Sequence, residues 1–430
     1  MLFSRCLYTV IGLAQDFVGS NNINLLVPSG QFGTRLSGGK DAASPRYIFT
    51  SLSRISRYIF PEEDDILLNY LEDDGQKIEP EFYAPILPLL LINGSQGIGT
   101  GWSTHVPSYN PEDILNYIIA RLDEVEDLPP IRPYARNFGG RIEPQEDGCG
   151  YVTYGRAKQA TENSVLIDEL PLGVWTDQYK QSLLKMRDRG EIMGFVENHT
   201  TTKVSFEVKL SSAKLQRIMN SATGLEGAFK LKSKLSTMNM HAFDANSVIH
   251  KYKSAEEIAD AFFAVRMALY HDRKSVLESE MKHASVLMKN KANFIRAVVD
   301  GEIDLISGRQ SKAEIVDQMK TLKFASASDL DMIRNDNTVL RQQEDEQDEE
   351  NDMGEAEGRQ EATTPIQEFD YLLNMALSNL TSEKITQLQD DAARKEQDLE
   401  AIQKRTPSDL WRADLEKLAP LIEKMKLESC

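Results

Sequence analysis

The spacing of apolar residues predicts short elements near the N-terminus of the chain. Residues 8–18 have the periodicity of an amphipathic helix, and its apolar face would consist of Val10, Leu13, Ala14 and Phe17. Asp64–Leu71 predicts a second, short helical stretch. Ile86–Ile92 (ILPLLLI) is a continuous apolar run, which is consistent with a buried strand.

Strand and helix patterns alternate in the middle of the chain, from Tyr109 to about Ala242. Val165–Glu169 (VLIDE) and Val204–Val208 (VSFEV) have the β-branched and aromatic composition of strands. We expect such strands to bury one face and to leave the other free. Three histidines in or near this region lie too far apart in sequence to suggest a ligand set: His199, His241 and His250.

Long helices are predicted in the last part of the chain. The sequence SAEE at residues 254–257 is a capping box, and neither Gly nor Pro follows it before Gly301. An unbroken helix over residues 254–300 would be about 70 Å long. A second helix is predicted from about Thr381, and Thr406-Pro407 starts a third. Two interpretations remain open at this point, namely an antiparallel coiled-coil arm with a small head or an ordinary helical domain.

Length and composition are those of a globular protein. The 430 residues suffice for about two or three domains. No apolar run reaches the roughly 18 residues that a membrane-spanning helix needs. The three cysteines, Cys6, Cys149 and Cys430, are widely spaced and odd in number, which is typical of a reducing compartment rather than of a metal cluster.

The net charge of −18 is unevenly distributed. Residues 344–361 contain ten acidic side chains against one arginine, whereas residues 1–60 contain six cations against two anions, a balance of +4. A basic N-terminal region therefore exists despite the acidic total. The charged, nearly apolar-free stretch 342–364 predicts a disordered insertion; mimicry of a nucleic acid is the alternative.

Candidate chemistry concentrates in the stretch Pro28–Tyr47. Its glycines allow sharp turns and close approach to a ligand. It also contains three cations suited to phosphate oxygens: Arg35, Lys40 and Arg46. Tyr47 follows Arg46 directly, and a guanidinium beside a phenol favours the phenolate and stabilises charge on an attacked phosphorus. The alternative is a half-buried aromatic residue with a solvated neighbour.

A second glycine-rich stretch, NGSQGIGTG at residues 93–101, follows the apolar run. It lacks the dinucleotide fingerprint, because Trp102 stands where the third glycine is required, and it lacks the Lys-Ser/Thr of a P-loop. A tight glycine turn at the end of a strand is the interpretation we favour over a nucleotide site.

Three stretches together resemble one known family. GSNNINLL, PSGQFGTRLSGGKDAASPRYIFT and EPEFYAPILPLLLINGSQGIGTGWSTHVP are similar to the breakage-rejoining core of eukaryotic (type IIA) DNA topoisomerase II. The resemblance implies a multidomain α+β fold. It would comprise a partial winged-helix domain at 1–87, a tower-like α/β domain at 88–245, and a coiled-coil arm with a helical C-gate at 246–430. Residues 1–6 do not match the family, so we expect a fragment.

The resemblance also implies roles for single residues. Tyr47 would form a transient 5′-phosphotyrosine link with DNA, and Arg46 would hold the scissile phosphate. Gln31, Arg35 and Lys40 match positions that line the DNA path. Ile98 corresponds to an isoleucine that is pushed between base steps to bend the duplex.

Further expectations follow from the family. The protein would be a nuclear enzyme, an ATP-hydrolysing DNA topoisomerase, that binds double-stranded DNA as a homodimer without a membrane. Mg²⁺ and ATP would serve the complete enzyme, and their ligands would lie in acidic (TOPRIM) and ATPase segments outside this chain. The family's Asp-x-Asp-x-Asp-Gly pattern is reduced here to Asp-Leu-Asp at 329–331, to which we assign no metal. The alternative function is a truncated product that binds DNA or dimerises without catalysis.

Overall fold

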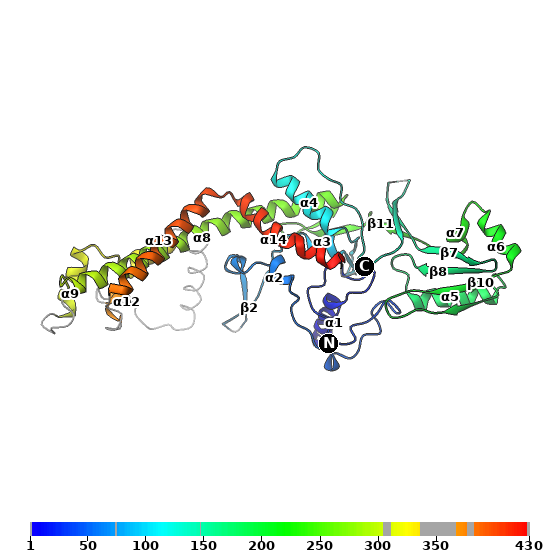
Figure 1. Cartoon of the computed structure of the whole chain (residues 1–430), viewed down its shortest axis with the longest axis horizontal. Helices are drawn as coiled ribbons and strands as arrows, with labels where there is room; N and C mark the ends of the chain where they lie inside the picture. The colour runs from blue at the N-terminus through cyan, green and yellow to red at the C-terminus, as the bar shows by residue number, and fades with distance from the viewer. Residues whose placement is uncertain are drawn as a thin grey trace. The chain divides into compact units, whose positions relative to one another are not determined.

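The computed structural model describes residues 2–73, 75–146, 148–303, 311–335, 367–375 and 382–427. Its contacts divide the chain into two compact units. The first consists of Met1–Glu62, Glu72–Arg266 and Arg412–Cys430, and the second of Glu63–Leu71 and Met267–Trp411. Figure 1 shows the elements of both units, and each unit is described below by itself.

Short elements form the N-terminal part of the first unit. They are α1 Leu2–Ala14, the 3-10 helix η1 Pro45–Tyr47, α2 Ser56–Ile59, β2 Gln76–Pro80, α3 Leu89–Asn93, β3 Ser95–Ile98, β4 Ser103–Val106 and α4 Pro111–Leu122. The 3-10 helix η2 Glu62–Leu67 and β1 Tyr70–Asp73 lie where the chain passes between the units. The helix predicted over Asp64–Leu71 is therefore found only as far as Leu67, as a 3-10 helix, and it is wrong at Tyr70 and Leu71, which belong to strand β1.

The predicted N-terminal helix differs from α1 at its end and in its buried face. Helix α1 stops at Ala14 because the Asn21 side chain donates hydrogen bonds to the carbonyls of Gly12 (2.7 Å) and Gln15 (2.9 Å). Among the α1 side chains that the structure describes, Ile11 and Ala14 are buried and pack with Phe32. The predicted face is confirmed at Ala14 and wrong at Val10 and Leu13, which are exposed.

The buried strand predicted for Ile86–Ile92 is also wrong, because the structure forms helix α3 there. Pro88 stands at the N-cap and its carbonyl accepts hydrogen bonds from the amides of Leu91 (3.0 Å) and Ile92 (3.2 Å). A short apolar run is buried in either structure, so its pattern alone does not distinguish them.

The middle of the chain forms two antiparallel sheets and a hairpin. The four-stranded sheet has the order β7-β8-β10-β9, and the three-stranded sheet has the order β11-β6-β5. The bounds are β5 Arg141–Pro144, β6 Gly150–Tyr154, β7 Arg156–Thr161, β8 Ser164–Glu169, β9 Gly194–Glu197, β10 Phe206–Lys209, β11 Lys232–Ser236, β12 Met240–Phe243 and β13 Ile249–Tyr252. The strand predicted at Val165–Glu169 is confirmed, and the one at Val204–Val208 is confirmed from Phe206 onward.

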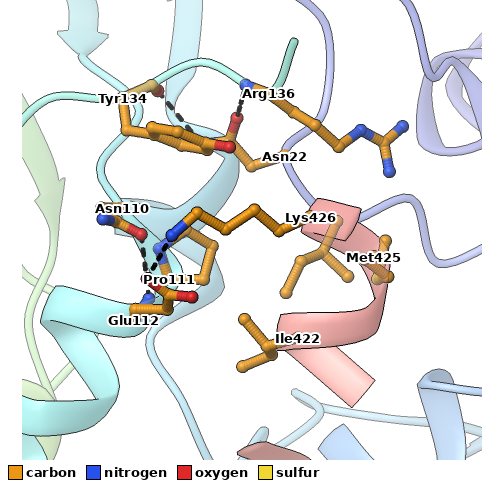
Figure 2. A pocket seen from close by; sticks show the side chains of 10 residues that line it. Asn22, Asn110, Pro111, Glu112, Tyr134, Arg136, Ile422, Met425 and Lys426 are labelled. Atoms are coloured by element: carbon orange, nitrogen blue, oxygen red, sulfur yellow. Dashed lines mark hydrogen bonds and ion pairs between the residues drawn. The ribbon is translucent and has the colours of Figure 1, made fainter. Parts of the chain in front are cut away.

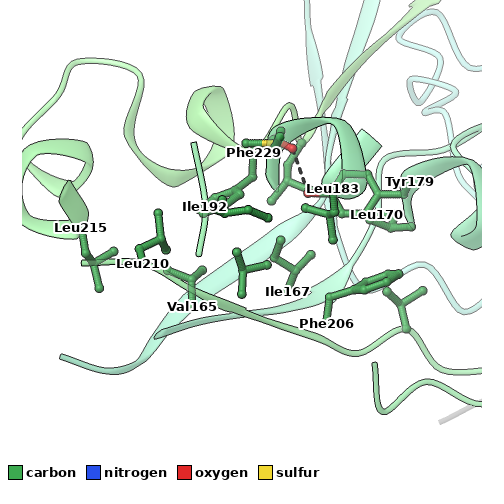
Figure 3. Close-up of a cluster of buried hydrophobic side chains, with 14 residues drawn as sticks. Val165, Ile167, Leu170, Tyr179, Leu183, Ile192, Phe206, Leu210, Leu215 and Phe229 are labelled. Carbon is green, nitrogen blue, oxygen red and sulfur yellow. Dashed lines mark hydrogen bonds between the residues drawn. The ribbon is translucent and has the colours of Figure 1, made fainter. Parts of the chain in front are cut away.

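One face of the four-stranded sheet carries the core of this region. Helices α5 Thr176–Asp188, α6 Ser212–Met219 and α7 Gly224–Ala228 contribute to it. Figure 3 shows Ile167 and Phe206 in the same apolar cluster as Tyr179 and Leu183 of α5. The hydroxyl of Tyr179 donates a hydrogen bond to the carbonyl of Phe229 (2.9 Å), and burial raises the pKa of this phenol. This core fixes the end of β8, which matters for the candidate site.

The last element of the chain ends in the first unit. Helix α14 Pro407–Leu427 presents Lys426 to Glu112 of α4, and their Nζ and Oε2 atoms are 2.7 Å apart. Figure 2 shows this pair beside a cavity of about 20 Å³ that Ile422 and Met425 also line. Such a volume has room for about one water molecule.

The second unit is helical. Helix α8 Ala255–Val299 begins in the first unit and continues in the second from Met267, and it confirms the long helix predicted over 254–300. At its start, the Ser254 hydroxyl accepts a hydrogen bond from the Glu257 amide (3.2 Å). The other elements are α9 Lys312–Thr321, α10 Ala327–Asn335, the 3-10 helix η3 Gln367–Phe369, α12 Asp370–Leu373 and α13 Ser382–Lys404. Helices α8 and α13 run antiparallel. Lys274 of α8 contacts Gln403 of α13, whereas Lys289, further along α8, contacts Glu396, which comes earlier in α13.

A small apolar head lies at the C-terminal end of α8. Phe294 of α8, Met319 of α9 and Leu372 of α12 are buried together in it. The predicted disordered insertion 342–364 and Cys430 lie outside the described residues. Within the described part of the chain, every helix is too short or too polar to cross a membrane.

The sheet core provides a test of this architecture. We expect Phe206→Ala to lower the free energy of unfolding by about 3–5 kcal/mol, because the ring is fully buried and a cavity would remain. The matched control is Phe243→Ala, whose ring is 69% exposed and whose loss should change stability by less than about 0.5 kcal/mol. Denaturant unfolding measures both, and equal losses would contradict the assigned core.

Candidate active site

Tyr47 lies on an exposed single turn of 3-10 helix. Pro45 begins the turn, and the Tyr47 amide donates a hydrogen bond to the carbonyl of Ser44 (2.9 Å). The Tyr47 side chain is 67% exposed, so the alternative of a half-buried aromatic residue does not apply. The Arg46 guanidinium carbon is 4.9 Å from the centroid of the Tyr47 ring. The structure thus brings an accessible phenol and a permanent cation together.

Backbone pairing holds the chain on the C-terminal side of Tyr47. Ser29 and Phe49 exchange two backbone hydrogen bonds, of 3.2 and 3.0 Å, and the Val27 amide donates to the carbonyl of Ser51 (2.9 Å). The side chains of Phe49 and Leu52 are 75% and 63% exposed. Tyr47 is therefore an exposed residue on a backbone that is paired, not free.

The glycine-rich loop on the other side of Tyr47 is closed by Asp41. Its carboxylate accepts hydrogen bonds from the Thr34 amide (2.9 Å) and the Thr34 hydroxyl (2.6 Å), and Gln31 Nε2 lies at 3.3 Å. Burial alone would raise the pKa of Asp41, but the hydrogen bonds from Thr34 outweigh it and hold the pKa below its usual value. Asp41 is thus a carboxylate at neutral pH. Lys40, beside it, is exposed.

Arg35 is not where the resemblance places it. Its side chain is buried, forms an ion pair with Glu169, and donates a further hydrogen bond to the carbonyl of Leu170 (3.2 Å). A guanidinium that is buried and paired in this way does not face solvent and is not available to a phosphate. The prediction that Arg35 contacts DNA is therefore corrected, because its charge is used inside the protein.

The same loop is attached to the start of α5. The Ser37 hydroxyl donates to Asp177 Oδ2 (2.6 Å), and the Asp177 amide donates to the carbonyl of Leu36 (3.0 Å). Gly38 lies against Trp175, and a Cβ added at Gly38 would be 2.3 Å from the indole. Sequence reasoning did not assign these roles to Glu169, Trp175 and Asp177. The sequence offered one signal, namely that the carboxylate of Glu169 ends an apolar strand. A charge at such a position is expected to be buried, and a buried charge requires a partner.

Ile98 lies at the tip of the β3–β4 hairpin. The turn is closed by a hydrogen bond from the Gly99 amide to the carbonyl of Trp102 (2.7 Å), which confirms the tight glycine turn. The Ile98 side chain is 92% exposed. The contacts described above do not join it to the loop of Tyr47.

A cleft of about 590 Å³ lies beside this tip. It is lined by residues of the β3–β4 hairpin and of β12 and β13, among them Trp102, His241 and Phe243. The Thr104 hydroxyl donates to the carbonyl of His241 (2.7 Å) and so joins β4 to β12. The exposed rings of Trp102 and Phe243 gave no signal in the sequence, because they come from hairpins far apart in the chain.

The described residues contain no group of three or more His, Cys, Asp or Glu side chains that could hold a metal ion. Asp329, from the Asp-Leu-Asp sequence, instead accepts a hydrogen bond from the Ser326 amide (2.9 Å) at the start of α10. The residues described here therefore do not fit a Mg²⁺ site.

Comparison with known proteins now identifies the family. Residues 4–416 match the family of the A subunit of DNA gyrase/topoisomerase IV. The chain belongs to this family. Among its relatives, DNA topoisomerase 2 of Arabidopsis thaliana is 40% identical over 97% of this chain and 28% of its own length. DNA topoisomerase 2-beta of Gallus gallus is 39% identical over 98% of this chain and 26% of its own length.

A solved structure agrees with the family assignment. The DNA-binding, cleavage and re-ligation domain of Plasmodium falciparum topoisomerase II matches this mixed α/β fold with a TM-score of 0.83 and 36% identity. The match covers 98% of this chain and 55% of that chain. The chain spans less than a third of the length of the two relatives named above.

The loop geometry generates a prediction for Gly33. Its φ is +103°, and an added Cβ would be 2.6 Å from the Cα of Gly39, so Gly33→Ala should lower the free energy of unfolding by more than about 1 kcal/mol. The control is Gly12→Ala in α1, where open space and a helical backbone predict a gain of about 0.5–1 kcal/mol. Thermal or denaturant unfolding compares the two, and a stabilised Gly33 variant would contradict the loop conformation.

Proposed function

We propose that this chain is the breakage-and-rejoining part of a type II DNA topoisomerase, with Tyr47 as the nucleophile. The observation that carries the proposal is an exposed phenol beside the Arg46 guanidinium, on a backbone fixed on both sides. The resemblance of this stretch to eukaryotic topoisomerase II supports the assignment. The similar Plasmodium falciparum domain, which is named for DNA binding, cleavage and re-ligation, supports it as well.

The proposed reaction is a transesterification. The Tyr47 hydroxyl oxygen bonds to a DNA phosphorus while the bond from phosphorus to the 3′ oxygen breaks, which leaves a 5′-phosphotyrosine link and a free 3′-hydroxyl. The phenol loses one proton and the departing oxygen gains one. Because one phosphoester replaces another, resealing needs no external energy. Arg46 would contact two phosphate oxygens and stabilise the charge that develops on them.

Other exposed residues would hold the duplex. Gln31 and Lys40 would contact phosphates, which positions DNA without reading its sequence. Ile98 would enter between base steps and bend the duplex, as apolar wedges do. Ile98→Ala should therefore reduce the bend, measured by energy transfer between dyes on the two ends of a duplex. Val125→Ala, which removes an exposed aliphatic side chain just beyond α4, is the control, and an unchanged bend in the Ile98 variant would remove the wedge role.

A homodimer follows from the chemistry, because two tyrosines are needed to cut two strands. We propose the division 1–87, 88–245 and 246–430 into winged-helix, tower-like and arm domains. The antiparallel pair α8 and α13 would be the coiled-coil arm, and the apolar head at its end would be the dimer-forming gate.

Metal and nucleotide chemistry would reside in other segments of the complete enzyme. Mg²⁺ and ATP are its proposed cofactors. We assign none of the described residues of this chain as a ligand of either one. The ATPase and TOPRIM parts are proposed partners. A nuclear location is the expectation that comes with the resemblance to eukaryotic topoisomerase II, and cell fractionation would check it.

A second candidate function is a non-catalytic binder that bends DNA or dimerises. It is favoured by the lack of a metal-ligand group among the described residues. Its signature would be salt-sensitive duplex binding without a covalent adduct, whichever segment is added.

The test of the proposal uses Tyr47→Phe. The chain is mixed with a TOPRIM segment of a relative, Mg²⁺ and supercoiled plasmid, and protein-linked linear DNA is measured after denaturation. We expect the variant to lose the covalent product completely and to keep duplex binding, because only the nucleophilic oxygen is removed. Tyr8→Phe, equally exposed on α1, should behave as wild type.

Two outcomes would contradict the proposal. Equal adduct formation by Tyr47→Phe would mean that another side chain is the nucleophile. Duplex binding by the wild-type chain without any adduct, under every complementation, would leave only the non-catalytic function.

A further inference from the structure

We propose that Glu169 is a positioning residue for cleavage, which acts through Arg35 on the loop that carries Tyr47. The inference rests on the proposed function of Tyr47. Glu169 lies 134 positions from Arg35 in sequence, at the end of β8 in the four-stranded sheet. It touches neither Tyr47 nor Arg46 in the contacts described above, so its role is to hold rather than to react.

The Glu169 carboxylate is fixed by contacts on both oxygens. Oε1 contacts the Arg35 guanidinium and accepts a hydrogen bond from the Leu170 amide (2.8 Å). Oε2 accepts a hydrogen bond from the Gly139 amide (2.9 Å). The residue is 4% exposed, and β8 beneath it pairs with β7 and β10 over a closely packed core. Glu169 is therefore held firmly at the C-terminal end of β8, an inner strand of the sheet.

The loop transmits this position toward Tyr47 through a series of short backbone links. Thr34, next to Arg35, binds Asp41 through both its amide and its hydroxyl and accepts the Gly39 amide at its carbonyl (2.9 Å). The Ala43 amide then donates to the carbonyl of Gln31 (2.9 Å). Residues 31–43 thus form one hydrogen-bonded body, and the turn that presents Tyr47 begins immediately after it.

A second attachment makes the anchor directional. Asp177 binds Ser37 and Leu36, and Trp175 covers Gly38. The loop therefore contacts both ends of the segment 169–177, through Glu169 at one end and Asp177 at the other. A single contact would leave the loop free to pivot, whereas two fix its orientation. Effective catalysis depends on such orientation, because a displacement of about 1 Å at the reacting atoms can reduce a rate by about 100-fold.

The ion pair also separates the cations of the loop into two roles. Arg35 is neutralised internally by Glu169, which leaves Arg46 and Lys40 as the exposed cations for phosphate. Loss of the Glu169 charge should therefore loosen the loop while the phosphate-binding cations remain. This predicts a separation between DNA affinity and the rate of cleavage that a general loss of folding would not produce.

The test compares Glu169→Gln with Glu197→Gln in the full chain, mixed with the TOPRIM segment, Mg²⁺ and plasmid. Glu197 is a matched control, because it lies on β9 of the same sheet, pairs with Lys180 of α5, and does not contact the loop in any interaction described here. We expect Glu169→Gln to lower the rate of covalent adduct formation about 10- to 100-fold with duplex affinity unchanged. Hydrogen exchange at the Gly39 and Ala43 amides should be faster, and exchange at Ile114 in α4 should stay as in wild type.

The outcomes separate this inference from the proposed function. If wild type forms no adduct, the proposed function fails, and exchange at Gly39 and Ala43 still tests the anchor. If wild type forms the adduct and Glu169→Gln forms it at the same rate, the positioning role is overturned. Unchanged exchange at Gly39 and Ala43 overturns it equally.

A second variant is used if Glu169→Gln destabilises the whole fold. Faster exchange at Ile114 in Glu169→Gln would indicate such destabilisation, and Asp177→Asn is then used, because it weakens only the exposed attachment to Ser37. Slower adduct formation with unchanged affinity would support the inference in that variant. Wild-type rates of both adduct formation and amide exchange would overturn it.

Discussion

The buried contact between Arg35 and Glu169 is the interaction on which the geometry around Tyr47 depends. An exposed side chain receives little support from packing, so its position is set by the backbone beneath it. Here that backbone is a glycine-rich loop, which would be mobile without attachments. The ion pair, the clamp of Thr34 on Asp41 and the strand pairing of Ser29 with Phe49 together convert it into a defined support. A buried charge left without its partner is costly, and this makes the arrangement sensitive to the loss of either partner.

The distribution of charge follows the same logic. The chain is acidic overall, yet its exposed cations near Tyr47 are those suited to a phosphate, and the one cation that faces inward is neutralised. If Arg35 faced solvent as Lys40 and Arg46 do, the loop would lose the ion pair with Glu169 that anchors it. Local placement, and not net charge, therefore makes an acidic chain compatible with a polyanionic ligand.

The sequence predicted what local patterns can specify. The capping box and the absence of Gly and Pro predicted α8 almost to the residue, and the resemblance led to the correct family. Local patterns failed where contacts from outside an element decide: Asn21, in the loop after α1, ends that helix, and Glu169 pairs with the buried Arg35 across 134 positions. The run ILPLLLI was misassigned because a helix and a strand bury it equally well. Tyr47 could be proposed from the sequence because Arg46, its neighbour in sequence, is also its neighbour in space, whereas Trp175 and Asp177 reach the loop only in the folded chain.

The central claim is that one phenolic oxygen, on this anchored loop, becomes esterified to a broken DNA strand. The most direct measurement is mass spectrometry of peptides from trapped protein–DNA complexes after nuclease digestion. The account predicts a nucleotide attached to the peptide that contains Tyr47, through a phosphodiester to the tyrosine oxygen. A nucleotide attached to any other side chain of this chain would contradict it.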